Sequence, residues 1–121
     1  MYERKIPLSL NCGLDLIGEV LYGKWKIRLL WFINEGSQRP SELQRNIPDA
    51  SRRVLNMQLK ELEEHELITK TIYPVMPPKV EYSLTELGRS LIPVIEVLGK
   101  WADDHDGILR KNILKRIPQI R

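Results

Sequence analysis

The chain has 121 residues, of which 42% are hydrophobic, and it carries a formal net charge of +3. This composition can fill one hydrophobic core but not two independent ones, so residues 1–121 are expected to form a single domain. Cys12 is the only cysteine, which excludes an internal disulfide, and no apolar run approaches the roughly 18 residues that a membrane span needs.

The start of the chain, residues 1–8, mixes acidic with basic side chains and has no long apolar stretch after them. A secretory signal peptide needs such a stretch, so the protein is expected to stay in the cytoplasm. Two helices are predicted next. Residues 13–22 carry an apolar stripe at helical spacing, and residues 24–35 carry a broad apolar face that ends before Gly36. The second helix is expected to be the buried, central one.

A helix-turn-helix is predicted over about residues 41–65. Ser41 and Gln44 are spaced as a capping box, in which the serine hydroxyl accepts from the glutamine N–H while the glutamine side chain reaches back. Residues 47–50 contain proline and aspartate, which favour a turn. Ser51 is then predicted to cap the second helix of the pair.

One β-hairpin is predicted over about residues 67–84. Residues 67–73 are rich in β-branched and aromatic side chains, and residues 79–84 alternate between apolar and polar at the period of a strand. Pro77 and Pro78 exclude a helix between them. Since the surrounding segments are all predicted helical, the fold class is mainly α (α+β), a winged helix-turn-helix with a two-stranded β-hairpin as its wing.

Terminal helices are predicted over about residues 85–117. Thr85 is expected to cap a long helix, in which Pro93 should produce a kink unless the helix restarts there. Gly107 is expected to break this helix before a basic amphipathic tail. So much apolar helix exceeds what one small core can bury, so a second copy is expected to cover it. The expected dimer interface consists of Leu91, Val94, Ile95, Leu98, Trp101, Leu109 and Ile113.

Positive charge is concentrated between Lys24 and Lys60, where eight basic side chains stand against three acidic ones. In the second helix of the helix-turn-helix, leucines lie on one side and polar side chains on the other. Such a face is most often a solvated surface. Between a turn and a wing, however, arginine and asparagine are typical of side chains that read base edges in DNA. The residues of this face are Arg52, Arg53, Asn56, Met57 and Lys60, and the sequence leaves open which of the two arginines faces the bases.

Several short motifs follow one another in a fixed order from Cys12 to about Trp101. They are Gly23-Lys24-Trp25, Arg39, Ser41-Glu42-Leu43, Ile47-Pro48, Ser51, Leu55, Leu59, Leu62-Glu63, Leu67-Ile68, Pro77-Pro78, Val80-Glu81-Tyr82-Ser83-Leu84-Thr85 and Leu87-Gly88. In these motifs the chain resembles the HxlR family of bacterial and archaeal winged-helix transcription regulators, which are relatives of the MarR regulators. Glu66 stands where this family normally has glycine at the end of the recognition helix, so a left-handed backbone conformation is expected there.

The resemblance implies a homodimer, joined through its terminal helices, that binds a pseudo-palindromic operator in double-stranded DNA as a repressor or an activator. It implies neither an enzymatic activity nor a cofactor. A small molecule and an oxidant are both open as effectors. Lys79, expected at the tip of the wing, should point at phosphate or the minor groove. The residues expected to contact DNA are Arg39, Ser41, Ser51, Arg52, Arg53, Asn56, Met57, Lys60 and Lys79.

Three further hypotheses concern other kinds of site. Cys12 lies where redox-sensing members of the resembled family carry a reactive cysteine, and a helix N-terminus favours the thiolate, although an inert thiol is the commoner case. A winged helix that binds only other proteins is an alternative function, against which the basic helix face argues. His65 and His105 lack any neighbouring ligands at metal-binding spacing, so no metal site is expected.

Overall fold

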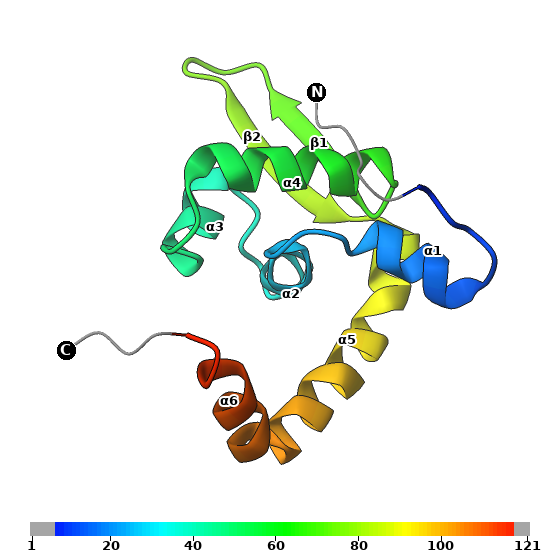
Figure 1. Ribbon diagram of the computed structural model, residues 1–121. Helices are drawn as coiled ribbons and strands as arrows, with labels where there is room; N and C mark the ends of the chain where they lie inside the picture. The colour runs from blue at the N-terminus through cyan, green and yellow to red at the C-terminus, as the bar shows by residue number, and fades with distance from the viewer. Residues whose placement is uncertain (1–6, 118–121) are drawn as a thin grey trace.

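Six helices and one antiparallel hairpin make up the part of the chain that the computed structural model describes, residues 7–117 (Figure 1). In chain order they are α1 (Gly13–Val20), α2 (Lys26–Asn34), α3 (Pro40–Asn46), α4 (Arg52–Glu64), β1 (Ile68–Tyr73), β2 (Lys79–Leu84), α5 (Glu86–Asp104) and α6 (Asp106–Leu114). This order confirms the predicted winged helix-turn-helix. None of the helices within residues 7–117 is both long and apolar enough to cross a membrane. Residues 1–6, which supplied most of the argument against a signal peptide, lie outside the described part.

Helix α2 occupies the centre of the molecule, where Figure 1 shows it end-on between α3, α4 and α5. Leu29 and Leu30 are completely buried, and Ile33 is 5% exposed. The helix contacts α3, α4, α5 and β2, so its broad apolar face is covered on several sides. The predicted central position of this helix is confirmed. Gly36 follows the helix with a φ of 107°, a conformation that glycine adopts without steric cost.

The first helix of the helix-turn-helix begins earlier than predicted, and its cap differs. Pro40 is the first helical residue and Arg39 is the N-cap. The Glu42 carboxylate accepts hydrogen bonds from the backbone N–H groups of Arg39 at 2.9 Å and Gln38 at 3.0 Å. The predicted capping role of Ser41 was therefore wrong. Proline is favoured at the first helical position because its missing N–H would have no partner there, and this moves the cap to Arg39.

The turn between α3 and α4 is held by side chains at both ends. Gln44, predicted to reach back to the cap, instead donates from its amide to the carbonyl oxygen of Ala50 at 2.6 Å. Ser51 caps α4 as predicted, because its hydroxyl oxygen accepts from the N–H of Val54 at 3.1 Å. The turn thus fixes the angle at which α4 leaves α3.

Glu66 ends α4 in the left-handed conformation that was predicted, with a φ of 61°. Its N–H donates to the carbonyl of Glu63 at 2.9 Å, and the N–H of Leu67 donates to the carbonyl of Leu62 at 3.0 Å. These two bonds form a Schellman motif, and the leucines at its ends are both buried. The motif offsets the cost of about 1 kcal/mol for a side chain in this backbone region.

The wing is anchored at its inner end and exposed at its outer end. Its strands pair from Ile68 with Leu84 to Tyr73 with Lys79. Ile68 is 1% exposed and Leu84 is 9% exposed, whereas all of β1 beyond Ile68 is exposed. The hairpin is therefore confirmed, and its two strands differ: β1 contributes only Ile68 to the core, whereas β2 contributes Leu84 and Tyr82.

The long helix α5 begins as predicted, since the Thr85 hydroxyl oxygen accepts from the N–H of Gly88 at 3.0 Å. A Cβ atom on Gly88 would collide with the carbonyl oxygen of Leu67, so only glycine permits this close approach of α5 to the end of α4. The helix continues without a restart through Pro93 to Asp104.

The predicted break at Gly107 was wrong, because α5 ends at Asp104 and α6 begins at Asp106. The intervening His105 places its ring Nδ1 2.7 Å from the carbonyl oxygen of Trp101, one of the last carbonyls of α5. Asp106 carries negative charge at the start of α6, where the helix dipole favours it. Gly107 therefore lies within the first turn of α6.

The junction between α1 and α2 contacts the inner face of α4. The Lys26 ammonium lies 2.9 Å from the Glu61 carboxylate, with the lysine side chain 2% exposed and the glutamate 44% exposed. The N–H of Trp25 donates to the Gln58 side-chain oxygen at 2.9 Å. A Cβ atom on Gly23 would lie 3.1 Å from the Gln58 side chain. Residues 23–26 thus hold two side chains of α4.

The ion pair of Lys26 predicts an asymmetric response to mutation. Glu61→Gln leaves a buried ammonium without its counter-charge, so it should lower the free energy of unfolding by about 1–3 kcal/mol. Adding Lys26→Met should recover most of this loss, because methionine fills a similar volume without charge. Urea denaturation of the two single variants and the double variant measures this cycle. An unfolding midpoint unchanged in Glu61→Gln would contradict a stabilising pair.

Candidate nucleic-acid interface

The outer face of α4 is polar and exposed, as predicted. Its inner face consists of Leu55, Leu59 and Leu62, each of which is completely buried. The alternation of the two faces follows from the helical spacing of the leucines. The exposed residues of the outer face are Arg52, Arg53, Asn56, Met57 and Lys60.

A hollow of about 530 Å³ lies between α4 and the wing, and it is lined by three basic side chains from the two elements and by one acidic side chain, Glu63 of α4. Arg52, Asn56 and Lys60, spaced four residues apart on α4, form one wall. The wing contributes Lys70, which stands opposite Tyr82 in the hairpin. Sequence reasoning missed Lys70. Its polar position in an otherwise β-branched strand was a usable signal once the register of the hairpin was known.

Arg53 and Met57 are not part of this wall. They lie on the side of α4 that points away from the buried leucines, while Arg52 lies on the flank that faces the wing. Met57 is 48% exposed. The outer face of α4 therefore consists of a central row and a flanking row, a division that the sequence left open.

Lys79 does not lie at the tip of the wing, contrary to expectation. The tip consists of residues 74–78, and Lys79 is the first residue of β2. Its ammonium lies 3.4 Å from the Glu81 carboxylate and 5.2 Å from the centre of the Tyr73 ring. The two prolines before it are used in making the turn, so the lysine falls in the strand. Lys79 thus faces back along the wing.

Arg39 shares the same carboxylate, since its Nε atom lies 3.7 Å from Glu81. The Arg39 side chain is 50% exposed. Ser41 is exposed at the start of α3, whereas the Ser51 hydroxyl is already engaged in capping α4. Glu81 therefore reduces the net positive charge around Arg39 and Lys79, two of the basic side chains that were predicted to contact DNA.

The pKa values of two groups near this surface are shifted. The backbone N–H groups of Arg39 and Gln38 hold the pKa of the Glu42 carboxyl below its usual value. Burial raises the pKa of the Tyr82 hydroxyl, and the Glu63 carboxylate adds to this effect. Glu42 is consequently a stable anion at the start of α3 and Tyr82 a neutral wall of the hollow.

A second surface runs along α5. Leu87, Val94, Leu98 and Trp101 are between 49% and 57% exposed. Together with the partly buried Leu91 they repeat at intervals of four and three residues, the spacing of a helix seam. Ile95, expected at the dimer interface, is instead 6% exposed and packs into the core of its own chain.

The other face of α5 explains this correction. Gly88, Ile92 and Ile95 form the buried side of the helix, and the helical spacing separates them from the exposed seam. In α6, Leu109 is partly buried and Ile113 is 62% exposed. The seam of α5 and Ile113 of α6 are thus apolar groups that stay exposed to solvent within residues 7–117.

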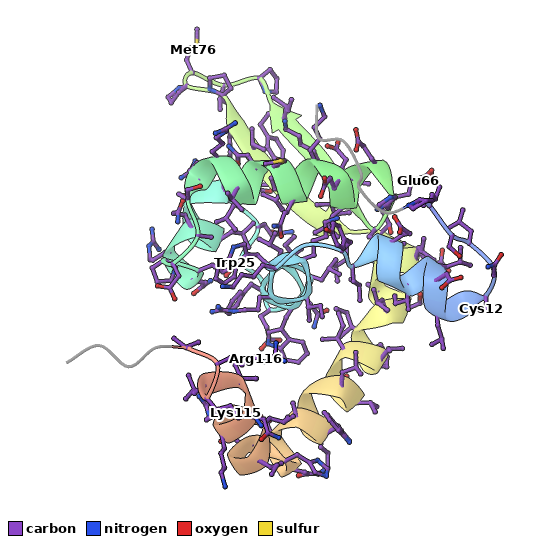
Figure 2. All side chains as sticks on the ribbon, viewed as in Figure 1. Cys12, Trp25, Glu66, Met76, Lys115 and Arg116 are labelled. Carbon is purple, nitrogen blue, oxygen red and sulfur yellow. The ribbon has the colours of Figure 1, made fainter. Side chains whose placement is uncertain are left out.

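Cys12 is exposed and precedes α1 directly (Figure 2). Its backbone carbonyl accepts from the N–H groups of Asp15 and Leu16, and its thiol makes no capping hydrogen bond. Within residues 7–117, no three histidine, cysteine, aspartate or glutamate side chains are grouped so that they could hold a metal ion.

Comparison with known proteins places these features among helix-turn-helix regulators. Residues 20–119 match the family described as HxlR-like helix-turn-helix. YkvN of Bacillus subtilis (strain 168), named an uncharacterized HTH-type transcriptional regulator, is 45% identical over 91 residues, which cover 75% of this chain and 77% of YkvN.

Two solved structures show the same arrangement of elements. The redoxregulator HypR in its reduced form has a TM-score of 0.78 at 35% sequence identity, covering 83% of this chain and 99% of HypR. The reduced form of the transcriptional regulator YodB from B. subtilis has a TM-score of 0.66 at 32% identity, covering 78% of this chain and 93% of YodB.

Proposed function

The chain belongs to the HxlR-like helix-turn-helix family, and we propose that it regulates transcription as a homodimer that binds a pseudo-palindromic operator in double-stranded DNA. Its relatives are named transcriptional regulators, a class of protein that is not enzymatic. The observation that carries the proposal is the hollow in which Arg52 and Lys60 of α4 converge with Lys70 of the wing. Basic side chains gathered from two elements on one concave surface suit a phosphate backbone.

Helix α4 would enter the major groove with its central row toward the bases. Arg53 occupies that row, so it is assigned to a base edge, and Asn56 reaches the same groove from the flank. Arg52, Lys60 and Lys70 surround the hollow and are assigned to phosphates. In a dimer, two such helices would read half-sites roughly 34 Å apart.

A second candidate function is redox control through Cys12. The thiol is exposed beside a helix N-terminus, and the similar HypR is named a redoxregulator. With one cysteine in each chain, oxidation would give an intersubunit disulfide, a mixed disulfide or a sulfur oxyacid. Each product would change the region in front of α1.

The assignment of α4 predicts distinct effects for its two arginines. Arg53→Ala should weaken binding to an operator selected from random DNA by about 1–3 kcal/mol and relax the preference at one base per half-site. Arg52→Ala should weaken all duplexes alike and flatten the plot of log affinity against log salt by about one unit. Titrations at several salt concentrations measure both effects.

Lys100→Ala is the matched control for the loss of one positive charge, since this exposed lysine lies on α5, away from the hollow. It should change neither the affinity nor the slope appreciably. If Arg52→Ala with Arg53→Ala left affinity and selectivity intact in a folded protein, α4 would not read DNA. Absence of any salt-dependent DNA binding by the wild type would favour a module that binds only proteins.

The seam on α5 predicts a dimer that one charge can disrupt. The wild type should sediment as a dimer at micromolar concentration, and Leu98→Glu should shift it toward monomer because it places a carboxylate in a covered apolar seam. Lys100→Glu, on another side of the same helix, should leave the dimer intact. A wild type that sediments as a monomer with and without DNA would exclude the homodimer.

Redox control predicts that mild oxidant changes operator affinity in the wild type and not in Cys12→Ser. Mass spectrometry on the oxidised sample identifies the product on the sulfur, and the same titrations as above give the affinity. Unaltered binding after complete oxidation of Cys12 would remove this candidate and leave DNA binding itself untouched.

A further inference from the structure

The tip of the wing is an exposed apolar surface. Met76 is 93% exposed and Val75 is 54% exposed, and Ile72 behind them is 60% exposed. Figure 2 shows Met76 at the far end of the wing, well separated from the body of the protein. An apolar group of this kind, held away from the core, is typical of a surface that contacts a partner.

Charge is absent from this tip. Residues 71–78 contain no basic or acidic side chain. The nearest lysine, Lys79, is directed back to Glu81 and Tyr73, and Lys70 belongs to the hollow beside α4. The tip therefore does not bind by attracting phosphates, and its partner must offer apolar contact.

The tip is also restricted in its conformation. Pro74, Pro77 and Pro78 fix three backbone φ angles around Met76, and the N–H of Val75 donates to the carbonyl of Tyr73 at 2.9 Å. Because the backbone around Met76 is already restricted, contact with a partner has to order only the methionine side chain itself. Met76 is thus presented as a wedge.

The neighbouring hollow indicates where the wedge would go. If α4 occupies the major groove, the strand of DNA that crosses the basic hollow is the one that separates this groove from the adjoining minor groove. Residues of α4 line one side of the hollow and residues of the wing line the other. Figure 1 shows the wing extending past α4 to its tip. Its tip would therefore meet the minor groove, where methionine and proline are among the residues that other proteins insert between base steps.

We propose that the tip of the wing inserts Met76 into the minor groove next to α4 and partly unstacks a base step there. This inference rests on the proposed DNA binding and adds a specificity determinant to it. Pyrimidine–purine steps unstack most easily, so the tip would select TA or CA/TG steps at a position that α4 does not touch. Lys70 and Lys60 would hold the strand between the two contacts.

The test uses the full chain and duplexes that the wild type enriches from a random DNA pool. Met76→Gln keeps the length of the side chain but makes it polar, and Met76→Leu keeps it apolar. At 93% exposure neither change should affect folding. Met76→Gln should lower the affinity by about tenfold, whereas Met76→Leu should stay within about twofold of the wild type.

Two further readouts separate a wedge from an ordinary contact. The slope of log affinity against log salt should be the same for all three proteins, since no charge changes. A fluorescent 2-aminopurine placed at the enriched pyrimidine–purine step should brighten with the wild type and Met76→Leu but not with Met76→Gln. Replacing that step by a GC step should weaken the wild type and leave Met76→Gln unaffected.

The outcomes distinguish this inference from the function it rests on. If the wild type enriches no duplex, DNA binding itself fails. If the wild type enriches a duplex and Met76→Gln binds and unstacks it like the wild type, only the insertion of Met76 is overturned. The exposed tip of the wing would then be expected to contact a protein partner.

Discussion

The fold depends on how firmly the inner face of α4 is held. Three completely buried leucines pack this face into the core, where side chains interdigitate closely. The contacts from residues 23–26 are directional, since Trp25 and Lys26 each engage one named side chain of α4. The outer face of α4 can therefore carry exposed basic residues that contribute nothing to the core, because contacts on the other sides of the helix determine its position.

The wing is positioned by a different part of the chain, the segment just before α3. The N–H of Tyr82 donates to the carbonyl of Gln38 at 2.8 Å, and the Gln38 side chain donates to the Ser83 hydroxyl at 3.2 Å. Glu81 joins Arg39 to Lys79 on the outer side. The segment that enters α3 thus ties the wing to the helix-turn-helix, and the width of the basic hollow follows from this connection. Glu81 pairs with Arg39 and Lys79, neither of which lines the hollow, so its positive side chains are Arg52 and Lys60 of α4 and Lys70 of the wing.

The elements were predictable wherever local chemistry decides them. Caps such as Ser51 and Thr85, the turn before α4 and the alternating strand β2 were all predicted from the residues themselves. The left-handed conformation of Glu66 was predicted only from the resemblance, because the resembled family normally has glycine at this position. Failures occurred where two local rules compete or where tertiary contacts decide. Pro40 displaced the cap from Ser41, and Lys26, which looks like a solvated base in sequence, is buried by a partner 35 positions away in the chain. The sequence could not predict that Arg52 and Lys70 line the same hollow, because this depends on the register of the hairpin.

The close junction between α4, the wing and α5 connects the two proposed surfaces. The Thr85 hydroxyl donates a hydrogen bond to the carbonyl oxygen of Glu66 at 2.7 Å, and Gly88 packs directly on the carbonyl of Leu67. Helix α5 therefore leaves the end of α4 at a fixed angle, and it carries one apolar face into the core and another, the exposed seam, outward. A second copy docked on that seam would set the distance between two α4 helices through rigid elements alone. An effector that changed the docking angle by a few degrees would shift both recognition helices together, so regulation in such a dimer requires no unfolding of the wing or the helix-turn-helix.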